Sequence, residues 1–153
     1  MSDVLRFTVP GEVRGKGRPR IVKIGGFSRL TADAKTASYE NLVALSAMEA
    51  MNRSGMAAAY FTGPVVVEIV ARFTPPASAS RKARAAMLSG EAPPTRKPDI
   101  DNIVKVLDAL NGIAWRDDAQ VVRIVAEKRY AEAPGLDVVI RPPVAAIFEA
   151  KAA

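Results

Sequence analysis

The sequence predicts a single α+β domain with a small mixed or antiparallel sheet flanked by helices. Segments that alternate in polarity or are rich in β-branched residues lie between segments with apolar residues at helical spacing. Strands and helices do not alternate strictly, as a parallel βαβ fold would require. The length of 153 residues suits one domain, and residues 1–153 show neither a repeat nor a linker.

The first half of the chain is expected to hold strands, a turn and a long helix. Period-2 alternation and paired glycines indicate a strand and then a hairpin, and apolar residues at helical spacing indicate the helix. The expected elements are strand 4–10, flexible basic loop 11–20, hairpin 21–30 turned at Gly25-Gly26, helix 32–51 with Thr31 as its N-cap, connection 52–62, and strand 65–73.

The second half is expected to be more irregular at its start and to return to strands. Proline pairs and an Asn-Gly step separate its segments. The expected elements are helix 80–89, Pro-rich loop 91–98, helix 100–110 closed by Asn111-Gly112, strands 120–130 and 136–141, and a short helix after Pro142-Pro143.

The amino-acid composition limits the kinds of catalytic and metal site that the chain can form. The chain contains no cysteine and no histidine, which excludes disulfides, thiolate zinc sites and histidine acid–base catalysis. Any catalysis must use carboxylates, lysine, tyrosine, hydroxyls or a metal held by oxygen ligands. No apolar stretch is long enough to span a membrane, and the N-terminus does not resemble a signal peptide, so a cytoplasmic location is expected.

The charge indicates a polyanionic partner. Lys and Arg number 22 against 16 acids, which gives a net charge of +6 and a pI near 9.9. Nucleic acid is the commonest partner of a basic chain, although a high pI without such a partner is the plain alternative. Residues 98–120 reverse the sign, with five Asp against two basic residues. Carboxylates inside a phosphate-binding field are useful if they hold a divalent metal.

The acidic segment predicts a catalytic face. In a helix that starts after Asp99, the side chains of Asp101, Lys105 and Asp108 share one face opposite the aliphatic residues. The pair Asp117-Asp118 follows a short loop that would return it towards the helix. Mg²⁺ prefers such oxygen ligands and keeps several waters, so two or three Asp suffice.

A plain alternative exists for each part of this segment. The helix can be a solvated one with an ion pair from Asp101 to Lys105, and Asp117-Asp118 can be a solvated turn. Three Asp from two elements, in a basic chain without His or Cys, favour metal-dependent phosphodiester cleavage. Lys105 could then neutralise a phosphate oxygen.

Two basic segments are candidate DNA contacts, although the first can also be a flexible solvated loop. Trp115 can stack on a base or, more simply, fill the core. Glu68 can be an extra metal ligand or a solvent-facing residue. The candidate DNA-binding residues are Arg14, Lys16, Arg18 and Arg20 in the first segment and Arg96 and Lys97 in the second, next to Arg81, Lys82 and Arg84.

The run K-P-D-I-D-N-I-V-K-V-L-D-A-L-N-G, followed by W-R-D-D-A-Q, resembles the RusA family of Holliday-junction resolvases. The upstream G-K-G-R-P-R is similar to that family's N-terminal region. The resemblance implies a RusA-like homodimer that cuts four-way junctions by symmetric paired nicks, in DNA recombination and repair, with Mg²⁺ or Mn²⁺. It places the catalytic residues at Asp99, Asp101, Lys105 and Asp118, and the metal ligands at Asp99, Asp101, Asp118 and the neighbouring acid Asp117.

Two other functions remain compatible with the residues. A non-catalytic, architectural protein that binds junctions would need the basic surface but not all of the acids. A hydrolase of small phosphate esters would not need the basic loop, and salt would affect it little, whereas DNA binding weakens steeply as salt rises.

Overall fold

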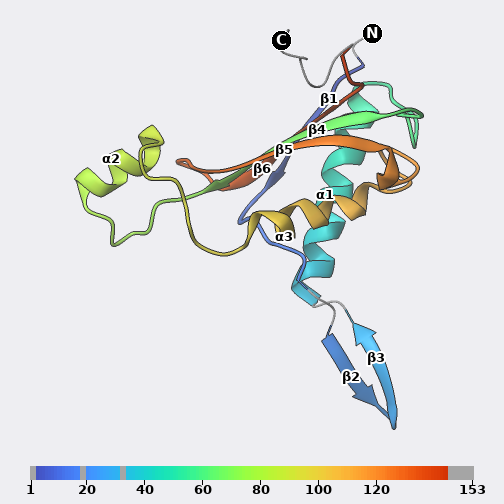
Figure 1. The fold of residues 1–153 in the computed structure, drawn as a ribbon, viewed down its shortest axis with the longest axis horizontal. Helices are drawn as coiled ribbons and strands as arrows, with labels where there is room; N and C mark the ends of the chain where they lie inside the picture. Colours follow the sequence, from blue (N-terminus) through green and yellow to red (C-terminus); the bar gives the residue numbers. More distant parts are fainter. Residues whose placement is uncertain (1–2, 18–19, 32–33, 145–153) are drawn as a thin grey trace, which may run out of the picture.

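The computed structural model describes residues 3–17, 20–31 and 34–144, in which helices cover one face of a four-stranded sheet (Figure 1). The sheet has the order β1-β6-β4-β5, with β4 and β5 parallel and the other neighbours antiparallel. The predicted α+β class and mixed sheet are therefore confirmed. The elements in chain order are β1 (Leu5–Pro10), β2 (Arg20–Ile24), β3 (Phe27–Thr31), α1 (Ala34–Arg53), β4 (Val65–Phe73), α2 (Arg81–Ser89), α3 (Ile100–Lys105), the 3₁₀ helices η1 (Val106–Leu110) and η2 (Asp118–Gln120), β5 (Val121–Tyr130) and β6 (Gly135–Arg141).

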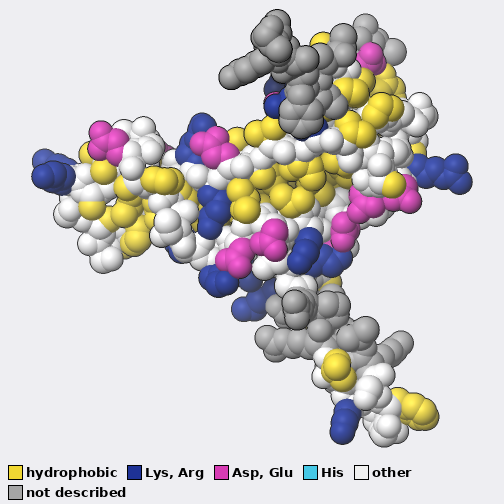
Figure 2. Space-filling view, viewed as in Figure 1, with side chains coloured by type: hydrophobic (Ala, Val, Ile, Leu, Met, Phe, Trp, Pro, Cys, Tyr) yellow, Lys and Arg dark blue, Asp and Glu magenta, His cyan; other side chains and the backbone are white. Residues whose placement is uncertain are grey.

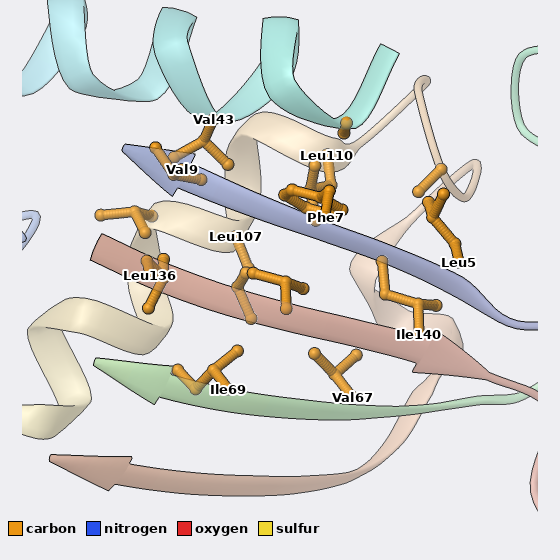
Figure 3. Close-up of a cluster of buried hydrophobic side chains, with 14 of the residues drawn as sticks. Leu5, Phe7, Val9, Val43, Val67, Ile69, Leu107, Leu110, Leu136 and Ile140 are labelled. Atoms are coloured by element: carbon orange, nitrogen blue, oxygen red, sulfur yellow. The ribbon is translucent and has the colours of Figure 1, made fainter. Parts of the chain in front are cut away.

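The core lies between the sheet and the two helices α1 and η1 (Figure 3). Alternate residues of β1 are buried, as the period of a half-buried strand requires. Val43 of α1 faces β1, and Leu107 and Leu110 of η1 fill the space between α1 and the sheet. Because η1 is fixed by this packing, the polar side of the α3–η1 segment has a defined position at the surface.

The predicted hairpin is confirmed. β2 and β3 pair antiparallel, and Ile24 lies opposite Phe27 across the turn. Gly25 and Gly26 have φ angles of 57° and 85°, which side chains disfavour and glycine accepts, so this is the tight turn that suits twisted strands. The hairpin extends away from the sheet beyond one end of α1 (Figure 1).

Several predicted boundaries change. Thr31 ends β3, and α1 begins only at Ala34, so Thr31 is not the N-cap. The expected helix 100–110 is a short α-helix that continues as 3₁₀ from Val106. Strand 65–73 is confirmed as β4, and α2 is capped by Ser80, whose Oγ accepts from the Ala83 N–H at 3.1 Å. The expected C-terminal helix falls on residues 145–153, outside the described residues.

No helix in the described ranges is long and apolar enough to cross a membrane.

Candidate active site

The start of α3 presents two carboxylates to solvent. Asp99 occupies the N-cap position, but its side chain does not cap the helix. The Lys97 ammonium lies 3.0 Å from Asp99 Oδ1 instead. Asp101 follows in the first turn and is exposed. The plain alternative, an ion pair from Asp101 to Lys105, is not the contact that Lys105 makes, because its Nζ donates to Asn102 Oδ1 at 3.3 Å.

The change from α to 3₁₀ geometry aligns the next two polar residues. In a 3₁₀ helix, residues three apart lie in line along the axis, so Lys105 and Asp108 lie on one side while Leu107 and Leu110 are buried on the other. Figure 2 shows basic and acidic side chains alternating over α3, next to an apolar area. This segment therefore places a carboxylate and a positively charged ammonium group side by side at one edge of the core.

A shallow pocket of about 370 Å³ brings these residues together with the second acidic element. Lys105, Asp108 and Asp118 supply polar groups to its wall, and Leu107 and Trp115 are among its apolar residues. The loop after η1 does return Asp118 to the helix, as the sequence predicts. Trp115 itself is fully buried and donates from Nε1 to Asn111 Oδ1 at 2.7 Å, so the suggestion that it stacks on a base is wrong.

Asp117 builds the turn that presents Asp118. The Asp117 carboxylate accepts from the Ala119 N–H at 3.0 Å, which caps η2. The Gln120 side-chain oxygen accepts from the Arg116 and Asp117 N–H groups at 2.9 and 3.1 Å. The Gln120 amide also donates to the carbonyls of Phe61 and Gly63, which ties the turn to the segment before β4. The Asp117 carboxylate is therefore already engaged in a hydrogen bond to the backbone of its own turn.

The two neighbouring acids have opposite electrostatic environments. The N–H of Ala119 lowers the pKa of Asp117, because it stabilises the charged carboxylate. Contact with the Asp117 carboxyl raises the pKa of Asp118, and the charge of Asp108 raises it further. Crowded carboxylates of this kind are relieved by a cation. Of the two acids, Asp118 is therefore the one whose charged form is repelled by neighbouring carboxylates, those of Asp117 and Asp108.

The donor set fits a hard divalent ion whose shell is completed by water and phosphate. Mg²⁺ is commonly held by one or two carboxylates together with substrate phosphates, and Asp118 and Asp108 offer such a pair. Within the described ranges, no three acidic side chains are grouped closely enough to hold a metal ion by themselves. The structure thus brings Asp118 to Asp108 and does not assemble Asp99, Asp101 and Asp118 into one cluster. The ligand roles of these three stay a prediction.

The N-terminal basic loop is packed against α3. The Lys16 N–H donates to the Asn102 carbonyl at 2.8 Å, and a Cβ on Gly15 would lie 2.8 Å from Asn102 Cβ. Val13 is buried. The expectation that residues 11–20 form a flexible loop is therefore wrong for the part around Gly15 and Lys16, because the absence of a side chain at Gly15 permits close backbone contact.

Lys16 faces acids of its own chain. Its Nζ lies 3.4 Å from Asp108 Oδ2 and 3.4 Å from Glu40 Oε2. It thus links α1, the loop and η1 beside the pocket. Of the other predicted contacts in this loop, Arg14 is exposed, Arg18 lies outside the described residues, and Arg20 begins β2 with its side chain undescribed.

The second basic segment lies over an aromatic ring. The Arg96 guanidinium is 5.5 Å from the centre of the Phe73 ring, and Lys128 Nζ is also 5.5 Å from it. Lys128 further donates to the Arg96 carbonyl. Lys97 remains largely exposed beside Asp99.

The structure changes the interpretation of three residues. Glu68 pairs with Arg141 at 3.5 Å, and its neighbours Val67 and Ile69 face the core, so it lies on the sheet face opposite the pocket and is not an extra ligand. Asp108 lies in the pocket although the resemblance assigns it no role, and its helical spacing from Asp101 and Lys105 is the sequence signal that points to it. Lys128 was missed because nothing in strand 120–130 relates it to Arg96.

Comparison with known proteins finds relatives over most of the chain. The family model described as endodeoxyribonuclease RusA matches residues 10–141. The chain is also 37% identical over 142 residues to the uncharacterized protein YqaN of Bacillus subtilis (strain 168), a match that covers 91% of this chain and 96% of that protein. The matched region contains both basic segments and all five aspartates of residues 98–120.

Proposed function

Because the chain belongs to the RusA endodeoxyribonuclease family, we propose that it is a metal-dependent endonuclease that resolves four-way DNA junctions by paired nicks. The observation that carries this proposal is the approach of Asp118 to Asp108 in a pocket that also holds Lys105, because crowded carboxylates beside a lysine suit a divalent cation and a phosphate. The sequence resemblance supplies the junction as the substrate.

The proposed endonuclease would use Mg²⁺ or Mn²⁺ as its cofactor. Asp118 and Asp108 would hold the ion at the pocket, Asp99 and Asp101 are the further ligands that the resemblance implies, and Asp117 would support Asp118 through the η2 turn. A bound ion supplies Lewis acidity towards the scissile phosphate. Lys105 is exposed at the pocket, with its Nζ near Asn102, from where it can neutralise charge that develops on the phosphate oxygens.

The basic residues would hold the DNA arms. Arg14, Arg96 and Lys97 are exposed and can contact phosphates, whereas Lys16 is already paired with Asp108 and Glu40 and more directly supports the pocket. A four-way junction has two-fold symmetry, so a homodimer would place two active sites on opposed strands.

The test compares a synthetic four-way junction with a linear duplex of the same arm sequence. The wild-type protein should nick the junction in Mg²⁺, leave the linear duplex intact and do nothing in EDTA. Asp101→Asn should remove cutting without loss of folding, with Asn52→Asp as a control on α1, away from the pocket.

Other results would identify the alternatives. Tight junction binding without cutting in Mg²⁺ or Mn²⁺ would point to an architectural protein. Equal cutting of the linear duplex would support the nuclease activity but contradict the proposed specificity for junctions. Hydrolysis of a small phosphate ester alone, insensitive to salt, would contradict a DNA substrate.

A further inference from the structure

The β2–β3 hairpin carries apolar side chains that the described fold leaves uncovered. Phe27 is 80% exposed, Ile24 is 57% exposed and Ile21 is 72% exposed. The two strands pair with each other and belong to no larger sheet, and the hairpin extends away from the body (Figures 1 and 2). Ile24 and Phe27 are cross-strand partners that flank the Gly25-Gly26 turn, so an apolar pair forms the tip. Ile21 points to the other face of the strand, so the exposed pair Ile24 and Phe27 at the projecting tip is what marks an interaction surface.

The charge of this part of the chain identifies the kind of partner. Residues 14–31 hold six Lys or Arg and no acid, whereas the whole chain has a net charge of +6. The other residues are therefore balanced in charge, and the entire excess lies in the hairpin and the loop that leads to it. A segment with this excess attracts a polyanion and repels the same segment of a second copy.

We propose that the hairpin tip recognises the branch point of the DNA, with Phe27 stacking on a base pair exposed where two arms part. This inference rests on the proposed function and adds the element that would distinguish branched from linear DNA. Base pairs inside a duplex are stacked on both sides, whereas one at an open branch point offers a π face to an aromatic side chain. Ile24 extends the apolar contact, and Lys23, also exposed, is one residue away to meet the phosphates.

The tip has the shape for this contact. A two-stranded ribbon is narrow enough to enter a DNA groove. The turn residues Gly25 and Gly26 carry no side chain, and a Cβ at either would meet nothing within 4 Å, so no neighbouring group blocks the approach. Loop residues Gly15 and Lys16 fix the start of this arm to α3, which connects the branch contact to the pocket.

The experiment measures DNA binding by the full chain in EDTA, so that cutting does not interfere. The probes are a four-way junction with 2-aminopurine at the branch point and a linear duplex of the same arm sequence. Phe27→Ser is compared with wild type, with Ser28→Ala as the matched control at the adjacent exposed position of the same hairpin and Phe27→Trp as the conservative variant. Thermal unfolding checks that each variant folds.

Phe27→Ser should weaken junction binding by about 5- to 100-fold, the range expected for loss of one base stack, and linear-duplex binding by no more than about twofold. It should also remove the 2-aminopurine signal change that wild type produces. Ser28→Ala should behave as wild type, and Phe27→Trp should retain the junction preference.

Equal junction binding by wild type and Phe27→Ser would overturn the inference, and so would an equal loss on both probes, which would indicate a general groove contact. Conversion of a dimer to a monomer by Phe27→Ser would show that the tip contacts a second copy instead. If wild type neither prefers nor cuts the junction, the proposed function itself fails. If wild type cuts the junction and Phe27→Ser binds it equally well, only the hairpin inference fails.

Discussion

Asp117 and Asp118 show how one turn gives adjacent identical residues different roles. Asp117 accepts a backbone N–H that lowers its pKa and fixes the turn. Asp118 meets the carboxyls of Asp117 and Asp108, which raise its pKa. The sequence alone could not choose between the two, because the choice depends on which carboxylate the backbone of η2 uses. The geometry favours Asp118 as the acid that serves the pocket.

The first prediction concerns the stability and the activity of variants at these two positions. Asp118→Asn should reduce junction cleavage by at least about 100-fold, because it would weaken the binding of the metal ion that stabilises the developing charge. It should also raise the melting temperature slightly at neutral pH, because the carboxylates of Asp117 and Asp108 that raise the pKa of Asp118 repel its charged form in the folded state. The stability gain should be present above that raised pKa and disappear in acid, where wild-type Asp118 is protonated.

Asp117→Ala is the matched comparison. It removes the acceptor for the Ala119 N–H, so it should lower the melting temperature at neutral pH and reduce cleavage less than Asp118→Asn does. Thermal unfolding at two pH values and single-turnover cleavage measure both effects. A stability loss in Asp118→Asn at neutral pH would contradict the assignment of roles.

At the scale of elements, the contact between the N-terminal loop and α3 organises the site. Gly15 and Lys16 pack on the α3 backbone, and Lys16 links Asp108 to Glu40 of α1. The sequence suggested a phosphate-contacting arm because local patterns show composition and not long-range contact. Residues 15 and 102 are too far apart in the chain for any periodicity to relate them.

The second prediction uses two glycines of this loop. A Cβ at Gly15 would lie 2.8 Å from Asn102 Cβ and 2.9 Å from Pro98 Cβ, whereas a Cβ at Gly17 would meet nothing within 4 Å. Gly15→Ala should therefore lower the free energy of unfolding by about 1–3 kcal/mol and reduce cleavage. Gly17→Ala should stay within about 0.5 kcal/mol of wild type. Chemical denaturation and cleavage rates measure these effects, and equal behaviour of the two variants would show that the close contact has no role.

Other elements could be predicted well, for local reasons. β4 has the predicted bounds because seven of its nine residues are β-branched or otherwise apolar and a proline pair follows it closely, and the hairpin follows from Gly25-Gly26. The 3₁₀ continuation after Lys105 was missed because no Gly or Pro interrupts the helical pattern there. Its cause is tertiary, since η1 buries Leu107 and Leu110 between α1 and the sheet.

At the scale of the whole molecule, the basic excess and the candidate catalytic acids lie in different regions. The basic excess lies in residues 14–31, at and before the hairpin, and the acids of residues 98–120 lie on α3 and the turn behind it. The hairpin region would hold the DNA together with Arg96 and Lys97, the acidic region would cut it, and the backbone contact of Lys16 joins the two regions. The sequence predicted both regions from composition, but it could not show that they meet at Asn102.

The most direct test of the proposed function maps the cut positions on a four-way junction whose strands are labelled one at a time. Two identical active sites on a two-fold substrate should nick opposed strands at matching positions in Mg²⁺, and ligase should seal the resulting duplexes. Nicks in one strand only, or products that ligase cannot seal, would contradict the account of this chain as a junction-resolving endonuclease.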